Sequence, residues 1–136
     1  MKEEYLFVYG TLMSGYDDKT SHSYLAKYGE FVGKATVQAK MFMIDYYPGI
    51  VQTKEKSIAR GELYKITDSE ALFSFLDKYE EYLVGDSSNS EFIREKITVK
   101  LNSSGKEYDS WAYFYNKDTD DLEVLPKGDF LNEYHK

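Results

Sequence analysis

The chain has 136 residues, with 24 acidic side chains against 17 basic ones, a formal net charge of −7, and no cysteine. This length fits one compact domain, residues 1–136, because domains usually run to roughly 100–200 residues. The lack of cysteine excludes a thiolate nucleophile, a Cys-ligated zinc and a redox pair. The negative charge argues against a nucleic-acid-binding surface, whose signature is a basic patch. Because His22 and His135 are the two histidines, a histidine metal cluster is not expected, and acid–base chemistry should rest on carboxylates or tyrosines.

We expect no targeting signal in the N-terminal segment. Its apolar run, residues 5–9, is shorter than the signal-peptide core of about 7–15 residues. No segment approaches the roughly 18 consecutive apolar residues of a membrane span. We therefore expect a soluble, cytoplasmic protein without a membrane partner.

The first expected strand is residues 5–9, an unbroken apolar and aromatic run of the kind buried on both faces of a sheet. It stops at a glycine-bounded loop, residues 10–15. A helix is predicted around residues 21–28, with Gly29 placed to end it.

Two longer strands follow. Residues 31–46 read as extended structure that ends at the turn signal Pro48-Gly49. Residues 57–66 form the next predicted strand, and Gly61 in its middle indicates either a bulge or a close backbone approach.

The clearest helix begins at residues 67–70, Thr-Asp-Ser-Glu, which match the capping-box pattern. Apolar residues then recur at the spacing of one buried helix face: Leu72, Phe75, Leu76 and Tyr79. Residues 92–101 and 108–115 predict a hairpin closed by a turn at 102–105. The acidic tail from Asp118 is expected to be loop. This order predicts an α+β domain with a mixed or barrel-like sheet.

The loop after the first strand is one candidate site. Gly10 and Gly15 have the spacing of the two glycines in a phosphate loop, but they are not followed by the lysine and hydroxyl residue that such a loop requires. A tight turn that leaves a buried strand still exposes backbone N–H groups, and converging amides bind a carboxylate or a developing oxyanion. The alternative is a plain strand-to-loop turn.

The end of the best helix is the other candidate. Glu80 lies four residues after Leu76, at the margin of the apolar face, whereas Glu81 falls near the opposite side. A carboxylate that is desolvated there has a raised pKa and becomes a competent general base near neutrality. The alternative is a solvated run of charges that closes the helix.

Three further groups are weaker candidates. Arg60, Glu62 and Tyr64 alternate onto one strand face, where an Arg60–Glu62 salt bridge is the simplest interpretation. Arg94 either clamps a substrate carboxylate or covers the sheet surface. The aromatic run 111–115 is typical of core, with two tyrosines on one face that could line a pocket.

Taken together, these segments resemble the gamma-glutamyl cyclotransferase-like family, whose YGTL or YGSL signature is similar to Tyr9–Leu12. The resemblance extends in order over nearly the whole chain, through the following segments: Gly33, Tyr47–Gly49, Gly61–Tyr64, Leu76–Glu80, Phe92–Arg94, Trp111–Asn116 and Gly128–Phe130.

The resemblance implies a small mixed β-barrel with flanking helices, a small-molecule gamma-glutamyl substrate, and no metal or other cofactor. It assigns Glu80 as the general acid/base, and Tyr9, Gly10, Thr11 and Leu12 as the residues whose backbone holds the gamma-glutamyl group. The implied reaction is intramolecular: the substrate's α-amine attacks its own side-chain amide and releases 5-oxoproline and a free amine.

Two departures from the family pattern concern the mouth of the pocket. Glu81 replaces a glycine often seen there, and residues 83–90 are loose and polar. The leaving amine therefore stays open, as does a homodimer. The competing hypothesis is a non-catalytic module that binds a small carboxylated metabolite in the same pocket.

Overall fold

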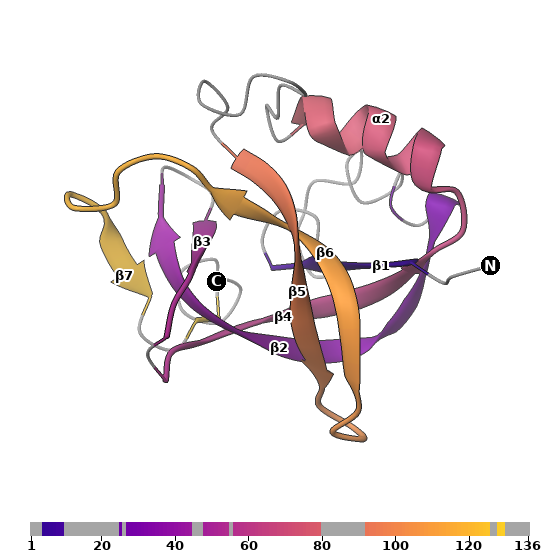
Figure 1. The fold of residues 1–136 in the computed structure, drawn as a ribbon, viewed down its shortest axis with the longest axis horizontal. Coiled ribbons are helices and arrows are strands. Elements are labelled where there is room, and N and C mark those ends of the chain that lie inside the picture. Colours follow the sequence, from indigo (N-terminus) through magenta and orange to yellow (C-terminus); the bar gives the residue numbers. More distant parts are fainter. Residues whose placement is uncertain are drawn as a thin grey trace.

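The computed structural model describes residues 4–9, 25, 27–44, 48–54, 56–79, 92–125 and 128–129. Within these ranges the chain forms a mixed sheet and one described helix, α2 (Figure 1). The elements are β1 (Glu4–Val8), β2 (Gly29–Met43), β3 (Pro48–Gln52), β4 (Ile58–Ile66), α2 (Ser69–Tyr79), β5 (Phe92–Leu101), β6 (Glu107–Tyr115) and β7 (Glu123–Leu125).

Five strands close into a barrel in the order β2-β4-β1-β6-β5, and β5 returns to pair with β2. The β1–β6 pair is parallel and the other four pairs are antiparallel, so the barrel is mixed. The long β2 continues past the barrel and pairs there with β3 and β7. The α+β class and the small mixed barrel are thus confirmed.

The interior of the barrel is filled by side chains from facing strands. Phe7 and Leu63 are direct partners across β1 and β4, and Val37 and Val99 are partners across β2 and β5. All four side chains are buried, as expected where side chains alternate between two faces.

Gly61 marks a close backbone approach, one of the two alternatives predicted for it. A Cβ atom at this position would lie 2.1 Å from the carbonyl oxygen of Val8 and 2.8 Å from the ring of Phe7. Only glycine lets β4 and β1 pack this closely. The irregularity of the ladder lies elsewhere, on β2 between Phe31 and Gly33.

Helix α2 is capped by Asp68 and not by the predicted Thr67. The Asp68 carboxylate accepts a hydrogen bond from the N–H of Ala71 at 3.1 Å, and its carbonyl accepts the first helical bond from Leu72 at 3.0 Å. The N–H of Thr67 instead donates to Tyr28. The predicted capping box is therefore wrong by one residue, because the N–H of Thr67 is already bonded to the carbonyl oxygen of Tyr28 and an aspartate is an equally good N-cap.

Of the predicted face, Leu72 and Leu76 are buried, and Phe73 is buried beside them. The side chains of Phe75 and Tyr79, also predicted for this face, lie outside the described residues.

Two other predictions need correction. Pro48 and Gly49 do not form a turn but begin β3, opposite Met43 and Phe42. A proline is tolerated as the first residue of a strand because it has no N–H to donate.

The tail predicted as loop contains the short β7, which pairs with Met41–Met43 of β2. The free edge of β2 recruits these three residues, which no alternation pattern identifies. The predicted helix end is consistent with the structure, since Lys27 and Tyr28 are helical and β2 begins at Gly29.

The described part of the chain contains no helix that is long and apolar enough to cross a membrane.

Candidate active site

Tyr9, the first residue of the YGTL element, lies directly after β1 and is buried. Its hydroxyl donates a hydrogen bond of 2.6 Å to the carbonyl oxygen of Tyr113 on β6, and its ring stacks on Phe7 at 6.2 Å between centroids. The side chain thus anchors the chain as it leaves β1. The hydroxyl proton of Tyr9 is used in this bond.

The other four predicted site residues, Gly10, Thr11, Leu12 and Glu80, lie outside the described residues. The residues that precede Gly10 and Glu80 in the chain are described. Gly10 follows Tyr9, and Glu80 follows Tyr79, the last residue of α2. The predicted site therefore draws on the segments that leave two well-packed elements.

Helix α2 is held against the sheet by an aromatic and cationic cluster. The Phe73 ring meets the Trp111 ring of β6 edge-on, with 6.1 Å between centroids. The Arg94 guanidinium of β5 lies 3.9 Å from the centre of the Phe73 ring and 5.0 Å from that of Trp111. Arg94 therefore stacks on both rings and joins the helix to β5 and β6, as cation–π contacts do. Figure 1 shows α2 beside the upper ends of these two strands.

Strand β6 carries both contacts described above, the hydrogen bond to Tyr9 and the packing against α2. Trp111 packs against α2 and is the register partner of Leu6 on β1, while Tyr113 accepts the Tyr9 bond. These β6 residues are two apart, which is about 6.6 Å along a strand. The chain leaving β1 and the helix that precedes Glu80 thus rest on neighbouring positions of one strand.

A buried carboxylate lies beside the end of β1. Glu62 of β4 is 6 % exposed and is the direct cross-strand partner of Val8. It accepts a hydrogen bond of 3.1 Å from the hydroxyl of Tyr64. Burial raises the pKa of Tyr64 well above its usual range, and the charge and hydrogen bond of Glu62 add to this rise. Tyr64 consequently remains a protonated donor.

The predicted common face of Glu62 and Tyr64 is confirmed by this hydrogen bond, whereas the ion pair with Arg60 stays a prediction. The sequence signal of this buried pair was the two-residue spacing of Glu62 and Tyr64. What the spacing does not reveal is that Val8 lies opposite.

The tyrosines predicted to share a face of β6 differ in their packing. Tyr113 is buried, and Tyr115 is half-buried against Phe92, with their rings edge-on at 5.6 Å. The described residues hold no cluster of three or more His, Asp or Glu side chains that could bind a metal ion.

Comparison with known proteins identifies the family. Residues 6–132 match the sequence model described as "Gamma-glutamyl cyclotransferase, AIG2-like". The chain is also 31% identical, over 115 residues, to "Putative gamma-glutamylcyclotransferase MJ1514" of Methanocaldococcus jannaschii, which covers 82% of this chain and 84% of that protein.

Solved structures share the fold at lower identity. An AIG2-like protein of Mus musculus superimposes with a TM-score of 0.70 at 18% identity, covering 93% of this chain and 88% of that one. YkqA of Bacillus subtilis gives a TM-score of 0.72 at 20% identity. The match covers 99% of our chain but 44% of the length of YkqA. The ytfP protein of Escherichia coli gives 0.63 at 24% identity, with 94% and 96% covered.

Proposed function

The chain belongs to the gamma-glutamyl cyclotransferase, AIG2-like family, and from this premise we propose that it converts a gamma-glutamyl amine or peptide to 5-oxoproline and a free amine. The observation that carries the proposal is the family match over residues 6–132. We assign Glu80 as the general acid/base, and the backbone of Tyr9, Gly10, Thr11 and Leu12 as the holder of the gamma-glutamyl group. The proposed place of action is the cytoplasm.

The proposed reaction needs one carboxylate and a set of N–H donors. Glu80 removes a proton from the α-amine of the substrate, whose nitrogen attacks the carbon of the side-chain amide. The new C–N bond closes a five-membered ring, and the carbonyl oxygen becomes an oxyanion that the loop N–H groups stabilise. Glu80 returns the proton to the leaving nitrogen, the original amide bond breaks, and 5-oxoproline and the amine depart.

Positioning supplies much of the proposed rate acceleration. The nucleophile and the electrophile belong to one molecule, and well-oriented intramolecular reactions reach effective molarities of roughly 10⁵–10⁸ M. The enzyme then has to hold the substrate in its cyclising conformation and move one proton. This requirement is compatible with a chain that has no cysteine.

The packing of the described residues supports this assignment. The Tyr9–Tyr113 hydrogen bond restrains the start of the YGTL loop, and the contact between Phe73 and Trp111 restrains α2 two helical turns before Glu80. A rigid scaffold on both sides is what a precisely positioned catalytic carboxylate requires.

The test is an assay of 5-oxoproline after incubation of the purified chain with a panel that includes gamma-glutamylalanine and gamma-glutamylethylamine. Glu80→Gln keeps the shape of the side chain and removes the base. We expect it to lower kcat roughly 10²- to 10⁴-fold. Glu70→Gln, at an exposed acid in the first turn of the same helix, is the matched control and should retain wild-type activity. Full activity in Glu80→Gln would exclude Glu80 as the base.

The alternative function is a binding module that holds a small carboxylated metabolite in the same pocket. The specific observation behind it is that Glu81 and residues 83–90 depart from the family pattern at the predicted pocket mouth. Binding of the panel compounds in calorimetry, without release of 5-oxoproline from any of them, would favour this function over the cyclotransferase.

A further inference from the structure

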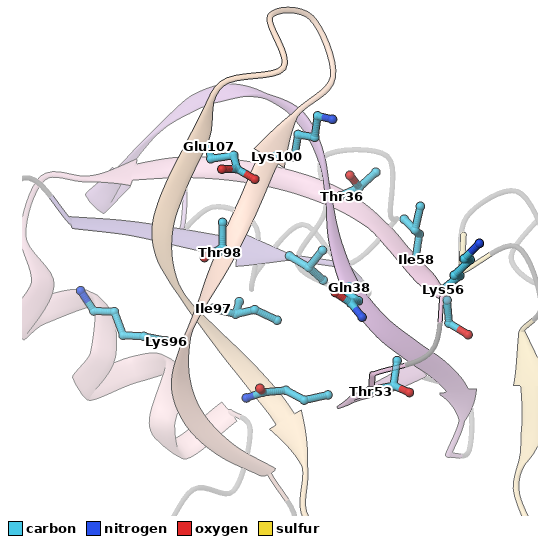
Figure 2. Close-up of a pocket in the computed structure, with 13 residues that line it drawn as sticks. Thr36, Gln38, Thr53, Lys56, Ile58, Lys96, Ile97, Thr98, Lys100 and Glu107 are labelled. Carbon is cyan, nitrogen blue, oxygen red and sulfur yellow. The ribbon is translucent and has the colours of Figure 1, made fainter.

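A hollow lies where strands β2 and β5 meet the connection between β3 and β4. It has a volume of about 720 Å³ and is bounded by β2, β5 and the connection between β3 and β4 (Figure 2). This is within the range of roughly 300–1,000 Å³ that small-molecule sites occupy. None of the residues assigned to the cyclotransferase reaction lines it.

The hollow exists because two strands diverge. The ladder between β2 and β5 runs from Ala35–Leu101 to Val37–Val99 and then ends. Beyond this point β2 turns to pair with β3, while β5 stays with β6. The gap between the diverging strands is lined by Ile97 and Val37 together with polar side chains.

The polar lining follows from strand alternation. Val37 and Val99 point into the barrel and are buried, so Thr36 and Gln38 on β2 and Thr98 on β5 point outward. Thr53 and Ser57 of the β3–β4 connection line a further side. The side chains that bound the hollow therefore carry hydroxyl and amide groups that can donate hydrogen bonds.

The charge of this region is opposite to that of the chain. Among the described residues, three lysines, Lys56, Lys96 and Lys100, and one acid, Glu107, line the hollow. The charges of these described side chains sum to 3 − 1 = +2, whereas the whole chain carries −7. The Lys96 amine rests over the Trp111 ring at 4.8 Å, so Lys56 and Lys100 are the two lysines best placed for a ligand. In Figure 2 they lie at separate rims, with Thr36 between them in the view.

We propose that this hollow, which we call the β2–β5 groove, binds a small phosphate-bearing metabolite. Lysine ammonium groups are compact charges that bind phosphate oxygens from any direction, and the threonine and serine hydroxyls supply further donors. The described lining contains no arginine, so its positive charge in the groove comes from lysine alone.

The binding experiment is an NMR titration of the ¹⁵N-labelled full chain with sodium tripolyphosphate at low salt. We expect shifts in the amide signals of Thr36, Gln38, Thr98 and Lys100. Lys56→Gln and Lys100→Gln should each weaken binding roughly 1.5- to fivefold, the effect of losing one exposed charge contact. Glu107→Gln should tighten binding, because it removes the acid of the groove.

Matched controls distinguish the groove from general charge effects. Lys54 lies in the same β3–β4 connection as Lys56 and is equally exposed, but it does not line the groove. Lys54→Gln should therefore bind tripolyphosphate like the wild type. The proposal would be overturned if Lys54→Gln weakened tripolyphosphate binding as much as Lys56→Gln does, or if the amide shifts were confined to other regions. Tighter binding of citrate than of tripolyphosphate would also overturn it.

Discussion

Replacing Gly61 by alanine tests the close contact between β4 and β1 that shapes this barrel. The added Cβ would lie 2.1 Å from the Val8 carbonyl oxygen and 2.8 Å from the Phe7 ring. Real Cβ contacts essentially never fall below 3.0 Å, so the two strands must separate by about 0.9 Å, the difference between 3.0 and 2.1. Because the obstacle is backbone, no rotamer change relieves it. We expect the free energy of unfolding to fall by about 1–3 kcal/mol, the range for overpacked cores.

The same displacement should reach the proposed site. Val8 precedes Tyr9, whose hydroxyl bond to Tyr113 is short at 2.6 Å. A shift of about 1 Å in a positioned group can lower a rate about 10²-fold. Gly61→Ala should therefore lower the kcat of the protein that remains folded, in addition to lowering its stability.

Urea denaturation measures the stability change, and 5-oxoproline release by the fully folded fraction measures kcat. Gly33→Ala is the matched control, because its nearest neighbour is the flexible Leu101 side chain, at 3.0 Å from the added Cβ. It should be milder in both measurements. Wild-type stability in Gly61→Ala would refute the reasoning from backbone contact, and a stability loss without a loss of kcat would refute only its link to the site.

Three more perturbations probe α2 and the buried tyrosine. Asp68→Ala should cost about 1 kcal/mol in urea denaturation by removing the N-cap, and a larger loss in Thr67→Ala would return the cap to Thr67. Arg94→Met keeps an apolar stem but removes the charge stacked on two rings, so it should cost roughly 0.5–2 kcal/mol; unchanged stability would contradict this role. The raised pKa of Tyr64 makes the folded state keep a proton that the unfolded state releases above about pH 10. Its contribution is therefore intact below pH 10 and falls by up to about 1.4 kcal/mol per pH unit above it. Tyr64→Phe should show a shallower loss between pH 10 and 11, and an identical slope would contradict the assignment.

Local patterns in the sequence were sufficient for most elements of the barrel. Continuous apolar runs predict β1, and the turn with glycine at 105 predicts the β5–β6 hairpin, where Gly105 indeed adopts a φ of 73°. The spacing of Leu72 and Leu76 predicts the buried face of α2. These features depend on residues close in the chain, so the sequence expresses them directly.

Features that depend on distant partners were not predictable in this way. Strand β7 forms because β2 offers an edge some eighty residues earlier in the chain, and the cap moves to Asp68 because Thr67 is bonded to Tyr28. The β2–β5 groove likewise depends on where the β2–β5 ladder ends, which no local pattern encodes.

The segments Tyr9–Leu12 and Leu76–Glu80 pointed to the family, and the composition, acidic and without cysteine, limited the expected acid–base chemistry to carboxylates or tyrosines. The tertiary structure decided which groups hold the elements next to the proposed site. In the folded chain the carbonyl of Tyr113 accepts the hydrogen bond of the Tyr9 hydroxyl, and Trp111 packs against Phe73 of α2. The buried Glu62 lies opposite Val8. Pairing between strands far apart in the sequence creates these contacts, and that pairing is settled only when the barrel closes.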